Sequence, residues 1–140
     1  VASIAASCKT IDILCNENGL ETIKSYSDSL CQGIRNLIAS HDLESYMEVK
    51  GYSCKSIVAF TPKDGLCIEE MKTYFMQECI KENLLYFCSH VPCVSHGEHE
   101  LNFSLNALDV AMSKFSEAMK HGNLLDKLES RIIEPIFRKA

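Results

Sequence analysis

The sequence predicts an α+β fold, in which helices pack on a small, mostly antiparallel sheet of three to four strands. Two observations favour this fold class. Apolar residues recur at helical spacing in several long stretches, and between them the period changes to the alternation that is typical of strands. The 140 residues are enough to bury one core. We therefore expect a single domain over residues 1–140, with a helical extension at residues 123–140.

The first part of the chain predicts two helices, at residues 2–16 and 20–40. Each carries one apolar stripe at helical spacing. The stripe of the first helix consists of Ile4, Cys8, Ile11 and Cys15. The stripe of the second helix consists of Ile23, Ser27, Leu30, Ile34 and Leu37. Gly33 lies inside the second helix, where a missing side chain can let another backbone come close.

The eight cysteines are many for a chain of this length. Cys8 and Cys15 lie on the first helical stripe, and Cys79 lies on that of a third helix. Free cysteine packs as a small hydrophobe. We therefore expect these residues in the core of a protein from a reducing compartment, and not in a disulfide framework.

The middle of the chain predicts a β-hairpin followed by the third helix. Residues 46–51 alternate and residues 54–60 are rich in β-formers, which favours an antiparallel pair. Residues 62–65 form a turn, because proline fixes φ and glycine accepts a positive φ. The helix is expected at residues 67–82, where Asn83 ends it in a left-handed conformation. Its stripe consists of Ile68, Met71, Phe75 and Cys79.

The last part of the chain predicts a short buried strand at residues 84–88, a loop to residue 98 and a final strand at residues 100–104. Asn106 is expected to cap the following helix. The stripe of that helix consists of Leu108, Ala111, Phe115 and Ala118. A final helix is expected at residues 124–137, with Leu125, Leu128 and Ile132 on one face and a kink or end at Pro135.

Composition excludes several classes of function. The net charge of −5 and the pI near 5.5 argue against a nucleic-acid surface, which needs clustered lysine and arginine. No apolar run is long enough to span a bilayer, and no secretory signal is evident, so we expect a cytoplasmic protein without a membrane partner. The chain begins at Val1 without an initiator methionine, which suggests a position inside a longer protein.

Four segments resemble the class III pyridoxal-phosphate aminotransferases, and the branch most similar in pattern is that of glutamate-1-semialdehyde aminomutase. Residues 5–14 (AASCKTIDIL), with Gly19 after them, resemble the Ala-rich helix of the family. Residues 51–60 (GYSCKSIVAF) resemble its Gly-x-Pro/Ser strand, and residues 71–87 (MKTYFMQECIKENLLYF) its helix and following strand. Residues 99–109 (HELNFSLNALD) resemble the family pattern His-Asn-Leu-Ser-x-x-His-Thr-x-x-Asp. Asn83 replaces the usual Gly, and Asn106 replaces the Thr cap.

The resemblance implies the C-terminal small domain of a fold-type I enzyme. In such enzymes a lysine of the large domain holds pyridoxal phosphate (PLP) as a Schiff base, and no lysine of this chain lies in a matching context. The resemblance therefore implies a domain that is not catalytic alone and holds no cofactor, with PLP in the parent protein. Its expected partners are the large PLP-binding domain of the same polypeptide and a second copy in a homodimer. Glu98, His99 and Asn102 are the residues that it assigns to the substrate cleft.

Three alternatives stay open at the level of sequence. Cys88, Cys93, His96 and His99 are residue types that zinc prefers, and they lie within twelve residues, although the spacing is cramped for a standard site. A cysteine and a histidine could form a nucleophile pair if the fold brought them together. A non-enzymatic interaction or dimerisation module is the third alternative, because an isolated small domain exposes an apolar face.

Overall fold

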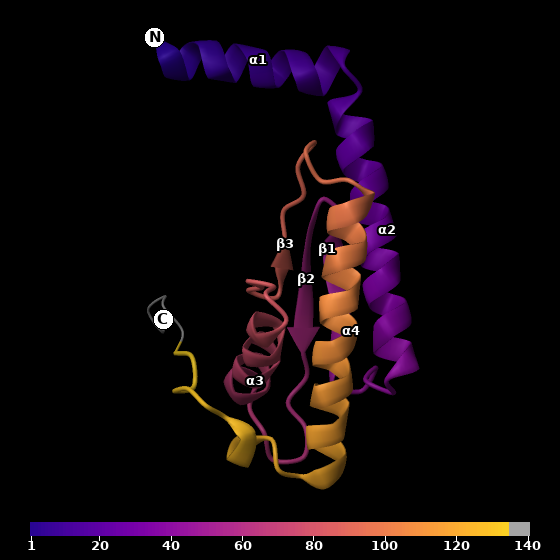
Figure 1. The fold of residues 1–140 in the computed structure, drawn as a ribbon, viewed down its shortest axis with the longest axis vertical. Helices are drawn as coiled ribbons and strands as arrows, with labels where there is room; N and C mark the ends of the chain where they lie inside the picture. The colour runs from indigo at the N-terminus through magenta and orange to yellow at the C-terminus, as the bar shows by residue number, and fades with distance from the viewer. Residues whose placement is uncertain (135–140) are drawn as a thin grey trace.

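The computed structural model describes residues 1–134, and in this part the chain has two layers, a sheet and the helices that cover it (Figure 1). The α-helices are α1 (Ala2–Asn16), α2 (Gly19–Ser40), α3 (Ile68–Lys81) and α4 (Glu98–His121). The strands are β1 (Met47–Tyr52), β2 (Lys55–Phe60) and β3 (Ser89–His90), and a 3-10 helix, η1, covers Leu125–Lys127. The predicted α+β class is confirmed.

The sheet is antiparallel throughout, with strand order β1-β2-β3. β1 and β2 form the predicted hairpin, in which Met47 lies opposite Phe60 and Tyr52 lies opposite Lys55. The turn between the hairpin and α3 has Gly65 at φ 82°, as its sequence predicts. β3 pairs with the other edge of β2, where His90 lies opposite Ser56. The sheet therefore has three strands among the described residues, at the lower end of the expected number.

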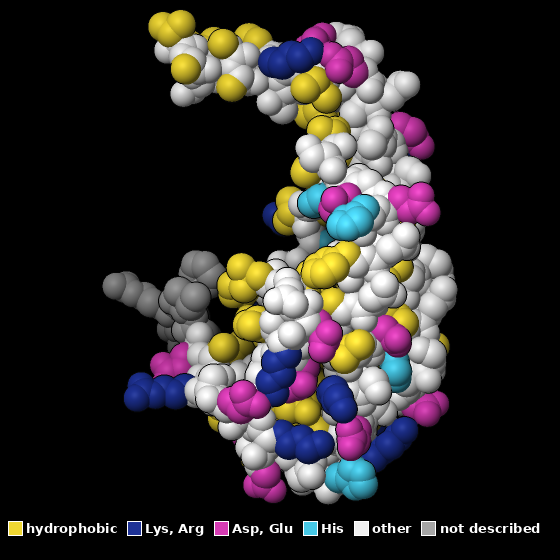
Figure 2. Space-filling model, viewed as in Figure 1, with side chains coloured by type: hydrophobic (Ala, Val, Ile, Leu, Met, Phe, Trp, Pro, Cys, Tyr) yellow, Lys and Arg dark blue, Asp and Glu magenta, His cyan; other side chains and the backbone are white. Residues whose placement is uncertain are grey.

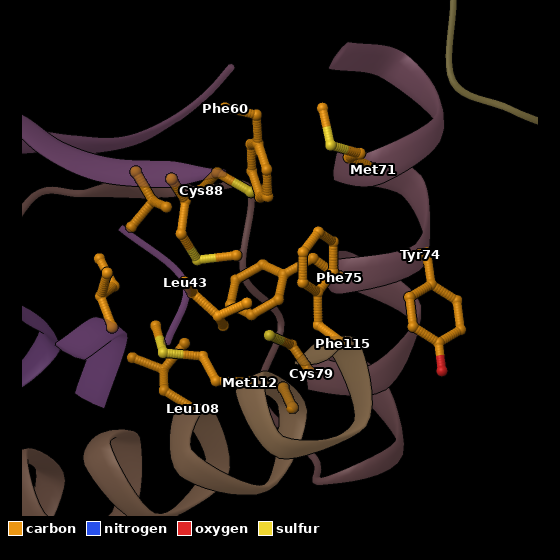
Figure 3. Packing of buried hydrophobic residues seen from close by; sticks show 14 of the residues in the cluster. Leu43, Phe60, Met71, Tyr74, Phe75, Cys79, Cys88, Leu108, Met112 and Phe115 are labelled. Atoms are coloured by element: carbon orange, nitrogen blue, oxygen red, sulfur yellow. The ribbon is translucent and has the colours of Figure 1, made fainter. Parts of the chain in front are cut away.

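The core lies between one face of the sheet and the helices α2, α3 and α4. Val58 and Phe60 of β2 are buried on this face, whereas Ile57 points to the other face and is exposed. Figure 3 shows Phe60 pointing toward Phe75 of α3 and Phe115 of α4. The apolar stripes predicted for the three helices supply many of the other core residues, although Ile68 of the predicted α3 stripe is exposed. One-sided burial of this kind is what the alternating strand pattern requires.

α2 and α4 run side by side and are in close contact at Gly33 (Figure 1). A Cβ atom at residue 33 would lie 2.6 Å from a methyl carbon of Leu105. The glycine in α2 therefore accommodates a leucine side chain of α4, where the sequence predicted the approach of a backbone.

α1 forms where the sequence predicts it, but it projects away from the body of the domain (Figure 1). Asn18 takes a left-handed conformation, φ 57° and ψ 22°, and this turns α1 out of the direction of α2. No residue of α1 is buried, and Cys8 and Cys15 are exposed. The prediction that these two cysteines are core residues is therefore wrong for this structure, whereas Cys79 is buried as predicted.

The two strands predicted after α3, at residues 84–88 and 100–104, are absent from the structure, so both predictions are wrong. Residues 84–88 form no strand: the Leu84 N–H donates to the Cys79 carbonyl oxygen at 2.9 Å, and the Cys88 carbonyl oxygen accepts a hydrogen bond of 2.9 Å from the Val58 N–H. Cys88 takes φ 59°, which bends the chain before β3 begins. Residues 100–104 are helical, because α4 starts at Glu98. Asn106 therefore lies inside α4 and does not cap it.

The prediction of a C-terminal helix is also wrong for the described residues. Among residues 123–134 only η1 is helical, and the following chain lies along α3. The Gln77 side chain holds it there, since its amide nitrogen donates to the Lys127 carbonyl oxygen at 3.0 Å and its oxygen accepts from the Glu129 N–H at 2.7 Å. These bonds use backbone groups that a helix would have paired internally. The predicted kink at Pro135 and the residues after it lie outside the described part.

Within residues 1–134, no helix combines the length and the apolar character that a membrane span needs.

Candidate functional site

The N-terminal end of α4 contains the three residues predicted to face a substrate cleft. Gly97 is extended and precedes the helix, and the carboxylate of Glu100 accepts a hydrogen bond of 2.9 Å from the Gly97 N–H. This bond lowers the pKa of Glu100. Glu98, His99 and Asn102 therefore lie on the first two turns of a helix, where the sequence predicted loop and strand, and all three are exposed. Exposure leaves them free to contact a ligand or another domain.

An open groove of about 650 Å³ lies beside this end of α4. Its far wall is the first half of α2, from Asn18 to Ser29, and its near wall contains Glu98 and Leu101. The rings of Tyr26 and His96 pack with centroids 5.3 Å apart at its base. Burial raises the pKa of Tyr26, so its hydroxyl stays protonated and able to donate. Of the three predicted residues, Glu98 is the one that lines this groove.

A second polar cluster lies inside the domain, and no sequence pattern predicted it. Ser56 Oγ and His90 Nδ1 are 2.9 Å apart, and Tyr86 Oη and His90 Nε2 are 2.7 Å apart. Cys31 Sγ donates to Ser56 Oγ at 3.2 Å. All four side chains are buried. The i,i+4 spacing of Tyr86 and His90 was the only sequence signal for this pair. That spacing brings side chains together in a helix, but this segment is not helical. Because solvent does not reach the cluster, it is not an open catalytic site.

The alternative metal site is not assembled. Cys88 is buried, Cys93 is exposed, and His96 packs on Tyr26 while its Nδ1 accepts a hydrogen bond of 3.1 Å from the Cys93 N–H. In the described residues, no three His, Cys, Asp or Glu side chains form a group that could hold a metal ion. The ligand set Cys88, Cys93, His96 and His99 is therefore not supported.

The lysines do not fit covalent attachment of PLP. A lysine that forms a Schiff base near neutral pH needs a lowered pKa, which burial away from other charges provides. None of the lysines in residues 1–134 is buried. Hydrogen bonds to carboxylates instead raise the pKa of Lys9, Lys24 and Lys81.

Two segments leave large apolar side chains exposed. On α1, Ile4 and Ile11 have no covering residue among those described. Between α3 and α4, Leu85 is 73% exposed, Phe87 61% and Val91 72%. Figure 2 shows hydrophobic side chains on α1 and along the inner edge of the hollow that lies beneath it. Exposed apolar side chains gathered in this way are typical of a surface that meets another protein part.

Comparison with known proteins identifies the fold. No family model matches the sequence, and no curated protein matches it. Among solved structures, a similar one is that of the FumI protein from Sphingopyxis sp. MTA144 in its PLP internal aldimine form. The TM-score is 0.70 at 18% sequence identity, over 83% of this chain and 27% of that chain. The fold is therefore similar to that of one part of the FumI chain. The chain spans just over a quarter of the length of that neighbour.

Proposed function

We propose that the chain is the C-terminal small domain of a class III PLP-dependent aminotransferase or aminomutase, in which it forms one wall of the substrate cleft. The observation that carries the proposal is the fold match to a limited part of the FumI chain, whose structure is that of a PLP internal aldimine form. The order of the four sequence segments, and not the structural match, favours the class III family. At 18% identity the structural match supports the fold alone. The class III assignment depends on the four sequence segments that resemble the family.

In this proposal the large domain of the same cytoplasmic polypeptide supplies the Schiff-base lysine and holds PLP. The exposed apolar side chains of α1 and of residues 85–94 support it, because they are suited to pack against such a domain. Glu98, His99 and Asn102 orient the substrate from the start of α4. The Glu98 carboxylate beside the groove would attract the ammonium group of an amino donor.

The native polypeptide tests the proposal directly. An antibody raised against residues 1–134 should isolate, from the cells that make the protein, a polypeptide several times larger than 15.7 kDa that carries PLP in stoichiometric amount. In that polypeptide Glu98→Gln should raise the KM for the amino donor with a smaller change in kcat, whereas His121→Gln, at the opposite end of α4, should change neither. A native polypeptide of 15.7 kDa without PLP would overturn the proposal.

The interaction module remains a second candidate, and the unpacked face of α1 favours it. Light scattering on the purified chain separates the two. A dimer that forms in a concentration-dependent manner, and that Ile4→Ser together with Ile11→Ser abolishes, would support a dimerisation module built on α1.

A further inference from the structure

The segment of residues 84–97 is attached to the sheet over a very short length. β3 contains two residues, Ser89 and His90, which pair with Ile57 and Ser56 of β2. One further backbone bond joins the Cys88 carbonyl oxygen to the Val58 N–H. On both sides of this contact large side chains are exposed, at Leu85 and Phe87 before it and at Val91 after it, whereas Tyr86 and Cys88 are buried in the core. The hydrogen-bonded attachment of the segment to β2 therefore depends on few groups.

The His90 side chain is the polar group that fastens this short contact. His90 is 8% exposed, with one ring nitrogen 2.9 Å from Ser56 Oγ of β2 and the other 2.7 Å from Tyr86 Oη of its own segment. The Tyr86 and His90 rings pack with centroids 5.0 Å apart. Because the imidazole is bonded at both ends, its removal would break the side-chain link between the segment and β2 and would also leave Tyr86 without this partner.

The groups that contact the imidazole are uncharged, although the charge of Lys72 in α3 acts on the Cys88 thiol. α2 contributes the Cys31 thiol, β2 the Ser56 hydroxyl, and the segment itself Tyr86 and Cys88. Cys79 of α3 lies near Tyr86 and Cys88. Burial raises the pKa of Tyr86 and Cys79, and it raises that of Cys88 to about 12, so these groups remain neutral. An imidazolium at this position would have hydroxyl acceptors but no carboxylate to balance its charge.

We propose that His90 is a pH-sensitive latch, whose neutral imidazole holds residues 84–97 on β2 and whose protonation releases them. Burial lowers the pKa of His90, and hydrogen bonding with Ser56 opposes this only in part. The attached state therefore favours the neutral form. Its stabilisation is complete above the ordinary histidine pKa of about 6.5 and is lost as the pH falls through the lower pKa of the attached state. Acidification exposes His90 to water, frees the apolar side chains of the segment and loosens the approach to Gly97, where α4 begins.

NMR of the full 140-residue chain tests the latch between about pH 7.5 and about pH 5, a range that brackets the histidine pKa of about 6.5. The heteronuclear NOE values of residues 84–97 should fall together with a midpoint below about 6.5, in step with the titration of the His90 ring. The amides of α2, α3 and the β1–β2 hairpin should not change over this range.

Variants separate the latch from other acid effects. His90→Gln keeps hydrogen-bonding groups without a titratable ring. Whether residues 84–97 of this variant are attached to β2 or released from it, their mobility should be the same at both pH limits. His99→Gln, an exposed histidine of the same region, should keep the transition at the wild-type midpoint. The latch is refuted if the wild-type segment does not change, if His90→Gln retains the transition, or if the whole domain changes together with the segment.

Discussion

Phe115 is the residue on which the aromatic part of the core converges. Its ring lies 5.9 Å from that of Phe60, 6.1 Å from that of Phe75 and 6.3 Å from that of Tyr74, measured between centroids. The sheet and two helices thus meet at one side chain of α4 (Figure 3). Pairs of aromatic rings with tilted or edge-on geometry contribute beyond the area that they bury.

Phe115→Ala should lower the free energy of unfolding by about 3–5 kcal/mol, because it removes a fully buried ring and leaves a cavity among rings that cannot all move in. Phe103→Ala, on the same helix at 43% exposure, is the matched control and should change stability by less than about 1 kcal/mol. Urea denaturation followed by circular dichroism measures both. Equal losses in the two variants would contradict the assignment of Phe115 to the centre of the core.

At the scale of elements, α1 and α2 differ in the packing contacts that stabilise them. α2 buries one side against β1 and α4, whereas α1 has no buried residue. Ion pairs from Lys9 to Asp12 and Glu17 lie on the surface of α1, where such pairs contribute little. A helix of 15 residues without a packed face is marginal in water. α1 should therefore be the least protected helix of the isolated chain.

Substitutions on the two apolar stripes test this difference. Ile34→Ala in α2 should cost about 2–5 kcal/mol, since Ile34 is fully buried. Ile11→Ala in α1 should change stability by no more than about 0.5 kcal/mol in the isolated chain. Chemical denaturation gives both values, and hydrogen exchange of residues 2–16 should be fast. A large effect of Ile11→Ala in a monomer would mean that α1 packs on this domain in solution.

The C-terminal chain depends on Gln77 and not on helix formation. Gln77→Ala removes two hydrogen bonds to the backbone at Lys127 and Glu129, and it should destabilise the protein by about 1–3 kcal/mol. Gln32→Ala, where the amide bonds only to the exposed Asn36 side chain, should have a much smaller effect. The difference in midpoint between the two variants in urea measures the contribution of the tail. Unchanged hydrogen exchange at residues 127–133 in Gln77→Ala would contradict the conclusion that Gln77 holds the C-terminal chain.

The elements that the sequence predicted well are those whose pattern extends over many residues. The stripes of α2 and α3 and the alternation of the β-hairpin each repeat several times, and the left-handed Asn83 was expected from residue type alone. A strand was predicted at the start of α4 because Leu101 and Phe103 alternate with polar residues. The competing helical spacing, from Leu101 to Leu105 and Leu108, extends over equally few residues. The tail was missed because Leu125 and Leu128 fit a helix, while the competing partner, Gln77, is distant in sequence.

At the scale of the whole molecule, the assignment of Glu98, His99 and Asn102 to a substrate cleft stays a prediction. Glu98 lies at a groove, but the Tyr26 and His96 rings that shape the groove come from segments far apart in sequence. The buried bonds of His90 likewise join β2 to the segment before α4. Pairings across the fold of this kind leave no periodic signal in the chain, so sequence patterns alone do not identify them.

The whole chain should not hold PLP by itself. None of its described lysines is buried, and hydrogen bonds to carboxylates raise the pKa of three of them, which opposes Schiff-base formation. After incubation with equimolar PLP and reduction with borohydride, mass spectrometry should find no single lysine modified in stoichiometric amount. A uniquely modified lysine with the absorbance of an internal aldimine would contradict this prediction and would make the chain a cofactor-binding protein in its own right.

The contact between Gly33 and Leu105 also bears on how the sequence can drift over evolutionary time. Because the two positions share one small volume between α2 and α4, a larger residue at 33 is tolerated only with a smaller one at 105. Descendants of this sequence should therefore exchange bulk between these two positions in compensating steps, although they lie seventy-two residues apart.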